Sequence, residues 1–94
     1  MRVVGRYELA EFMAAHANSR PAFGVWLATV TTAAWTSPAD VLATFPRASS
    51  VRSGVMVFRL KGNSYRLAAR IDFAGGVVRI LAVGTHAEYS RWEL

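Results

Sequence analysis

The sequence predicts an α+β fold in which two to three helices pack on one face of an antiparallel-rich sheet. From Val55 to Trp92, apolar and polar residues alternate with period two around two glycine-containing turns, which is typical of two β-hairpins followed by a helical turn. The segments before Val55 carry apolar residues at helical spacing. With 94 residues, 53% of them hydrophobic, we expect one small domain over residues 1–94 with its own core.

The two turns predict a strand register. If Gly62 and Asn63 form a two-residue loop, the expected pairs are Leu60 with Tyr65, Phe58 with Leu67 and Met56 with Ala69. If Gly75 and Gly76 form the second loop, the expected pairs are Phe73 with Val78, Ile71 with Ile80 and Ala69 with Ala82. Both hairpins then place their apolar residues on one shared face, whereas a slip by one residue would scatter them over both faces.

The same register predicts a cationic face on the other side of the sheet. It carries Arg59 opposite Arg66, then Arg70, then Asp72 opposite Arg79, with Lys61 at the first turn. Net charge is +5, and ten of the eleven cations are arginine, whose planar fork suits phosphate. A polyanion, either nucleic acid or an acidic protein, is the natural partner of such a surface. An arginine row is about as often a solvated or acid-paired face, and the expected pair of Asp72 with Arg79 is consistent with that alternative.

Three helical segments are expected before the hairpins, after a short first strand at Met1–Arg6 whose partner the sequence does not specify. Tyr7–Asn18 is predicted as a helix with the apolar stripe Leu9, Phe12, Met13 and His16. Pro21 suits the start of a second helix, with the stripe Phe23, Trp26, Leu27 and Val30. We expect these two helices to form an antiparallel pair on the apolar face of the sheet.

The third helical segment is predicted within Trp35–Pro46. Ser37 is the expected N-cap, Pro38 takes the first helical position and Asp40 completes a capping-box-like pattern. The residues expected to point inward are Val41, Leu42 and Phe45. The following segment, 47–54, is predicted as a polar loop that leads into the sheet.

Several classes of protein and site are disfavoured. The chain has no cysteine, no apolar run near the roughly 20 residues of a membrane span, and no apolar stretch typical of a signal peptide, so we expect a cytoplasmic protein without contact with a membrane. Its two histidines lie seventy residues apart without a carboxylate partner, and its glycines do not form a phosphate-binding loop. We therefore expect neither a metal nor a cofactor.

The remaining candidate site is a group of cations with one imidazole and one phenol: Arg66, Arg70, Arg79, Lys61, His86 and Tyr89. Thr85 and Glu88 have capping-box spacing, and a helical turn there would place His86 and Tyr89 on one side. This inventory suits cleavage of RNA by its own 2′-hydroxyl group, which needs groups that move protons and cations that stabilise charge on the phosphate. A histidine at such a junction is more often a hydrogen-bonding residue than a catalyst. For His16 and Tyr65 we expect packing roles.

Three segments resemble one known family. They are Trp35–Phe45 (WTSPADVLATF), Gly62–Arg66 (GNSYR) and Val83–Tyr89 (VGTHAEY), and together they resemble the HigB toxins of bacterial type II toxin–antitoxin systems, within the RelE-like group. The resemblance implies a RelE-like fold, a metal-independent endoribonuclease that cleaves mRNA on the ribosome, and a HigA-type helix-turn-helix antitoxin through which operator DNA is bound indirectly.

The resemblance, which covers Asn63, Arg66, His86 and Tyr89 among the site residues, and the predicted cationic face together give the expected roles. The catalytic residues would be His86, Arg66, Tyr89 and Arg70, and the RNA-binding residues would be Arg59, Lys61, Asn63 and Arg79. Leu81 stands where many family members carry a basic residue, and Ser90 stands where an aspartate is frequent. These departures motivate an alternative: a catalytically weak RNA- and antitoxin-binding module that acts as a co-repressor with its antitoxin.

Overall fold

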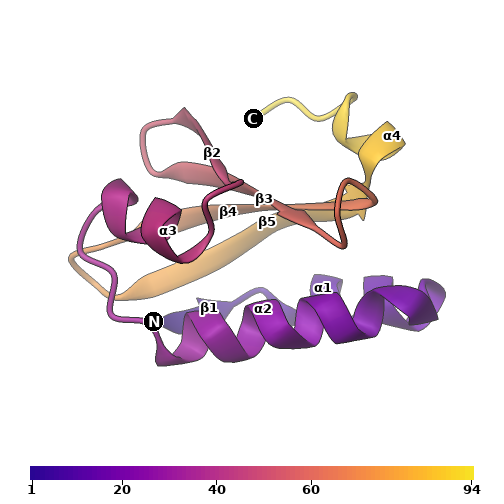
Figure 1. The fold of residues 1–94 in the computed structure, drawn as a ribbon, viewed down its shortest axis with the longest axis horizontal. Coiled ribbons are helices and arrows are strands. Elements are labelled where there is room, and N and C mark those ends of the chain that lie inside the picture. The colour runs from indigo at the N-terminus through magenta and orange to yellow at the C-terminus, as the bar shows by residue number, and fades with distance from the viewer.

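A computed structural model describes residues 1–94 and confirms the α+β class, with a twisted five-stranded sheet and helices (Figure 1). The strands are β1 (Arg2–Val4), β2 (Ser49–Arg52), β3 (Val55–Leu60), β4 (Tyr65–Asp72) and β5 (Val77–Thr85). The helices are α1 (Arg6–Ala15), α2 (Arg20–Thr32), α3 (Pro38–Thr44) and α4 (His86–Tyr89), with a 3₁₀ turn at Ala17–Ser19. None of the helices is both long and apolar enough to cross a membrane.

The strand order is β1-β5-β4-β3-β2, and every neighbouring pair is antiparallel except β1 and β5. The first strand was predicted, and the structure gives it a parallel partner at the far end of the chain. The prediction of a loop over residues 47–54 was wrong in part, because Ser49–Arg52 forms β2. A short polar segment can be an edge strand because it needs hydrogen bonds on one side only and no buried face.

The first hairpin has the predicted register, with Leu60 opposite Tyr65 and Phe58 opposite Leu67. The predicted register of the second hairpin was wrong by two residues. Ile71 lies opposite Val78 instead of Ile80, because the turn spans four residues, 73–76, instead of two. A shift by two keeps each side chain on its predicted face, so the division into an apolar and a cationic side survives there.

A β-bulge in β5 then changes that division. Ala69 pairs with Ile80 and Ala68 pairs with Ala82, which leaves Leu81 without an opposite residue. Beyond the bulge the alternation is reversed, so that Val83 packs against the core and Gly84 lies opposite Arg66. The predicted pairing of Ala69 with Ala82 was wrong because of the two-residue shift before the bulge, and uniform alternation cannot anticipate the bulge that follows.

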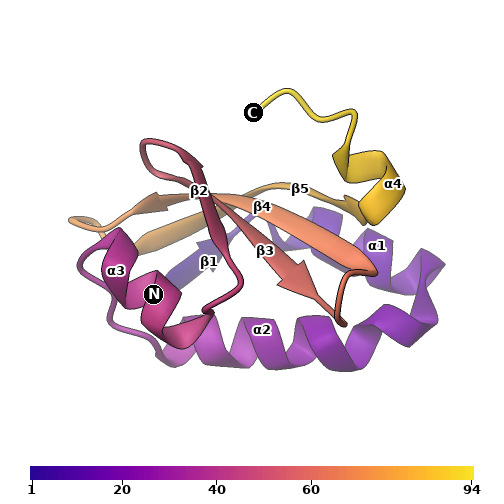
Figure 2. The same cartoon turned by 45° about the horizontal axis from the view of Figure 1, so that its top comes forward.

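Helices α1 and α2 cover one face of the sheet, whereas α4 and the segment after it lie over the opposite face (Figures 1 and 2). The predicted stripe of α2 is confirmed by the complete burial of Phe23, Trp26 and Val30. The first helix ends at Ala15, earlier than predicted, and the 3₁₀ turn follows it. His16 stacks on the Phe12 ring at a centroid distance of 4.1 Å, which supports the packing role expected for it.

The start of α3 differs in detail from the prediction. Ser37 occupies the N-cap position, but its side chain makes no capping hydrogen bond. Instead, the backbone N–H and the hydroxyl of Thr36 donate to Asp40 Oδ2 at 2.8 and 2.9 Å, and the backbone hydrogen bond is the main cause of the lowered pKa of Asp40. Val41 is buried as predicted, whereas the inward orientation predicted for Leu42 was wrong, since its side chain is exposed.

Candidate active site

A capping box fixes the start of α4, as predicted. The Glu88 backbone N–H donates to Thr85 Oγ1 at 3.2 Å, and the Thr85 N–H donates to Glu88 Oε1 at 2.8 Å. The second bond is the main reason that the pKa of Glu88 lies below its usual range. A helix of four residues has little stability of its own. This cap, together with a hydrogen bond from the His86 N–H to the Ser64 carbonyl oxygen, sets the direction of His86 from the sheet.

Arg66 is the central residue of the site. It projects from β4 and is only 3% exposed. Its Nη1 donates to the carbonyl oxygens of Asn63 and Tyr65 at 3.0 and 3.3 Å. Its Nη2 lies 3.0 Å from His86 Nδ1, and its Cζ lies 5.4 Å from the centroid of the Tyr89 ring. Three of the predicted site residues therefore lie in contact with one another, and we call them the Arg66–His86–Tyr89 cluster.

The charge of Arg66 has no carboxylate among its partners. Burial lowers the pKa of its guanidinium, and Arg59 lowers that pKa further, while Tyr89 opposes the change and Arg47 adds to it. The group nevertheless stays charged at any physiological pH. A largely buried cation beside two further cations is costly unless an anion approaches. The cluster therefore has the electrostatic character of an anion site.

The contact between Arg66 and His86 defines the state of the imidazole. A guanidinium has only donors, so Nδ1 of His86 has to accept and the ring proton is carried by Nε2. Protonation of Nδ1 would place two donors against each other. Nδ1 is thus free to accept from another donor only when Arg66 finds another acceptor. The structure has no group of three histidine, cysteine, aspartate or glutamate side chains arranged to hold a metal ion.

The other predicted site residues are distributed more widely. Arg59 lies opposite Arg66, as predicted, and Asn63 Oδ1 accepts from Arg66 Nη2 at 3.4 Å. Lys61 turns toward the helices, where its Nζ donates to the Asn18 carbonyl oxygen at 3.4 Å. Arg70 is four residues further along β4, about 13 Å away at the usual rise of a strand. It therefore lies apart from the cluster.

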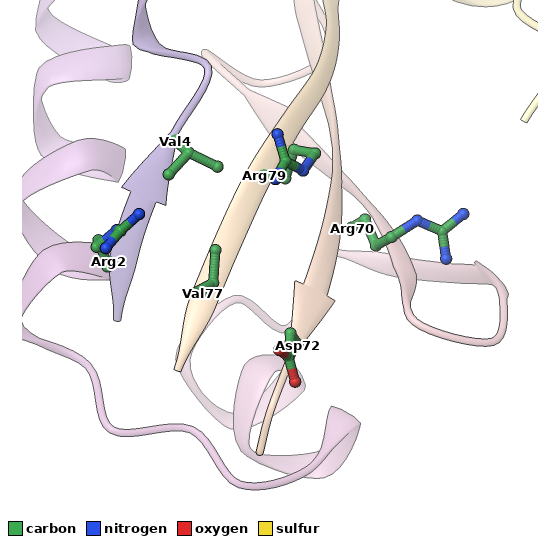
Figure 3. Close-up of a pocket in the computed structure, with 6 residues that line it drawn as sticks. All are labelled: Arg2, Val4, Arg70, Asp72, Val77 and Arg79. Carbon is green, nitrogen blue, oxygen red and sulfur yellow. The ribbon is translucent and has the colours of Figure 1, made fainter. Parts of the chain in front are cut away.

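Arg70 and Arg79 lie directly opposite each other on neighbouring strands. The predicted pair of Asp72 with Arg79 was wrong, since Asp72 lies opposite Val77. The Asp72 carboxylate is directed toward the following turn, where Oδ1 accepts from the Gly75 N–H at 2.9 Å (Figure 3). Together with Arg2 these side chains line a hollow of about 220 Å³ on the face of the sheet that α1 and α2 do not cover.

A family model decides the identity of the chain. The model describes the RelE-like toxic component of a toxin–antitoxin system, named HigB_toxin, and it matches residues 19–92. The chain belongs to the HigB_toxin family. Comparison with curated protein sequences finds no significant match. The matched range contains every strand and α-helix except β1 and α1, and the sheet with its helices is consistent with a RelE-like fold. As the toxic component of a toxin–antitoxin system, a HigB-family protein has an antitoxin as partner.

Two residues of this HigB-family site were not singled out from the sequence. Arg47 reaches Asn63 Oδ1 at 3.5 Å and contributes to the charge around Arg66, although it comes from the predicted loop. Trp92 packs against the Tyr89 ring at a centroid distance of 5.5 Å. Its spacing of three from Tyr89 was a usable signal, because a continued helical turn places such residues on one side. Gly84 makes room for this packing, since a Cβ there would lie 2.9 Å from the Trp92 ring.

Proposed function

We propose that this HigB-family toxin is a metal-independent endoribonuclease that cleaves mRNA on translating ribosomes by attack of the RNA's own 2′-hydroxyl group. The observation that carries the proposal is the largely buried Arg66, which contacts His86 and Tyr89 and has no carboxylate partner. A phosphodiester is an anion that fits such a cation, and its neighbouring 2′-hydroxyl needs a proton acceptor of the kind that His86 offers.

Binding of the scissile phosphate would change the contacts of Arg66. A non-bridging phosphate oxygen would accept from Nη2, which in the free protein faces His86 Nδ1. The Nη1 bonds to the carbonyl oxygens of Asn63 and Tyr65 hold the guanidinium in place while this exchange occurs. Arg59 would add to the stabilisation of the negative charge that develops in the transition state.

The same exchange would release His86 Nδ1 for proton transfer. It would take the proton of the 2′-hydroxyl as the 2′-oxygen forms its bond to phosphorus. The bond from phosphorus to the 5′-oxygen would then break, and the Tyr89 hydroxyl would donate a proton to the leaving oxygen. The products would be a 2′,3′-cyclic phosphate and a 5′-hydroxyl, and solvent would return the proton from His86 to Tyr89.

The proposal includes a partner and a compartment. We propose a HigA-type helix-turn-helix antitoxin, which would bind operator DNA on behalf of the complex. An acidic antitoxin surface would suit a toxin with a net charge of +5. An enzyme that acts on translating ribosomes would work in the cytoplasm.

The test is expression of the chain without antitoxin, followed by mapping of the 5′ ends of cellular mRNA. We expect growth arrest and new mRNA ends for the wild type, and a loss of cleavage of about 10²- to 10⁴-fold for His86→Ala. Arg66→Ala should be equally inactive, and Arg66→Lys should be intermediate because it keeps a charge without the fork. Arg6→Ala, which removes an exposed charge on α1, is the matched control and should cleave like the wild type.

Thermal unfolding and antitoxin binding check that each variant is folded. Cleavage at the wild-type rate by both His86→Ala and Arg66→Ala would refute the assignment of this site. Unaffected growth and intact transcripts for the wild type would favour the alternative, a catalytically weak co-repressor. Comparison of naked mRNA with mRNA in a translation extract tests the requirement for the ribosome.

A further inference from the structure

A second feature of the cationic side is a groove between the sheet and the C-terminal segment. After α4 the chain turns back over the sheet toward the turn between β2 and β3 (Figures 1 and 2). The groove beneath it has a volume of about 580 Å³. Its cationic lining residues are Arg52, Arg70 and Arg91, and its apolar ones include Leu81, Ala82 and Trp92.

The groove begins beside the Arg66–His86–Tyr89 cluster. The Tyr89 ring contacts Arg66 on one side and the Trp92 ring on the other, at 5.4 and 5.5 Å. Trp92 is therefore one aromatic ring away from the position proposed for the scissile phosphate. A strand of RNA that leaves the cluster across the face of the sheet would next meet Trp92 and then Arg70.

The groove is lined by three arginines and by one acidic side chain, Glu93, so its net charge is positive. Arg70 and Arg79 lie directly opposite each other, an arrangement that is destabilising for like charges. The nearest acid on that strand, Asp72, is bound to the Gly75 N–H instead. Arg70 lines both this groove and the hollow that contains Arg79, so the groove and the hollow adjoin each other at Arg70.

We propose that this groove binds the nucleotide of single-stranded RNA that flanks the scissile position, with its base on the Trp92 ring and its phosphate on Arg70 and Arg52. The proposal rests on the proposed function, because it takes RNA as the substrate. Aromatic rings beside arginines are the combination that binds single strands with little sequence preference. An acidic peptide would use the arginines but not the aromatic ring or the apolar floor formed by Leu81 and Ala82. Arg70 thus acts as a binding residue.

The test uses a fluorescently labelled RNA decamer with 2′-O-methyl groups throughout, which cannot be cleaved by 2′-hydroxyl attack. Binding to the full chain is measured by anisotropy over a series of salt concentrations. We expect Trp92→Ala to weaken binding about tenfold, and Trp92→Phe to weaken it less because it keeps a ring. Arg70→Ala should weaken binding and reduce the slope of log K against log salt by about 0.7, the value for one phosphate contact on a single strand.

Arg6→Ala removes the same charge from the helical side and should bind within about twofold of the wild type. A decamer of abasic sugar-phosphate separates the two contacts, since Trp92→Ala should leave its binding unchanged while Arg70→Ala should still weaken it. Thermal unfolding of each variant identifies a general loss of structure. Trp92→Phe and Arg70→Ala both keep an aromatic ring at position 92 that can contact Tyr89, so the local packing is retained in them.

The proposal would be overturned if Trp92→Ala and Arg70→Ala bound the decamer with the same affinity as Arg6→Ala, whatever the cleavage result. Poly-glutamate that binds more tightly than the decamer, and loses affinity in the same variants, would also overturn it and assign the groove to an acidic protein segment. The two proposals fail separately: a wild type that binds the decamer in this groove but cleaves no mRNA refutes the nuclease alone.

Discussion

Removal of the Thr85 hydroxyl tests whether the capping box holds His86 and Tyr89, the proposed catalytic side chains, in place. Thr85→Ala deletes the acceptor of the 3.2 Å bond from the Glu88 N–H and leaves the 2.8 Å bond from the Thr85 N–H to Glu88 intact. Loss of an N-cap side chain costs about 0.5–2 kcal/mol, and the length of the lost bond places this case near 0.5–1 kcal/mol. Because α4 has only four residues, nearly all of that cost lowers the stability of the helix itself relative to a locally disordered state.

The consequence for activity follows from that magnitude. If His86 and Tyr89 react only from the ordered helix, a cost of about 0.5–1 kcal/mol lowers kcat/KM roughly two- to fivefold. The global unfolding temperature should change little, since α4 contains no buried residue. Thr85→Ser keeps the hydroxyl and is the control.

The assay combines cleavage with a local structural probe. NMR shifts of the His86 ring report its contact with Arg66, and they should move toward values of a free imidazole in Thr85→Ala but not in Thr85→Ser. Cleavage and ring shifts that are identical in Thr85→Ala and the wild type would show that α4 is held by other contacts, and that this reasoning is wrong.

Three further predictions concern stability. The pKa of Glu88 is lower in the folded protein than its ordinary value of 4.5. The ionised carboxylate therefore stabilises the fold above pH 4.5, and this stabilisation is lost as the pH falls through the lower folded value. Glu88→Gln should remove that part of the acid dependence of the unfolding midpoint. Gly5 has φ +85°, and a Cβ there would lie 3.0 Å from the Ile80 carbonyl oxygen, so Gly5→Ala should lower the free energy of unfolding by about 1–3 kcal/mol. Gly24→Ala, in the interior of α2 with open space around it, should raise that free energy by about 0.5–1 kcal/mol, and calorimetry that finds the same sign for both glycines would contradict the argument.

The parts of the fold that could be predicted are those that local chemistry determines. The first hairpin and the capping box of α4 depend on residues close together in sequence, and both were predicted correctly. The parallel pairing of β1 with β5 joins strands that lie more than seventy residues apart in the sequence, and it has no local signal. The four-residue second turn and the bulge at Leu81 depend on how β5 fits its neighbours, which alternation alone does not specify.

The same distinction applies to the site. The sequence placed Arg66, His86 and Tyr89 together, because the turn at Gly62 and the helical spacing of three bring them to one place. It grouped Arg70 with them because both arginines share a face, although a shared face does not mean a short distance along a strand. Trp92 was missed because its position depends on the path of the chain after α4 and on the absent side chain of Gly84.

The bulge at Leu81 gives this toxin one position in the groove at which the side chain can be substituted with little effect on the fold. The pleat places the other residues of β5 on the core face or on the cationic face, and a change of polarity at a core-facing position would cost stability. Leu81 has no residue opposite it and lines the groove, so its side chain can be exchanged without re-sorting either face. A substitution there can therefore alter the charge of the proposed RNA-binding groove while the scaffold stays as it is.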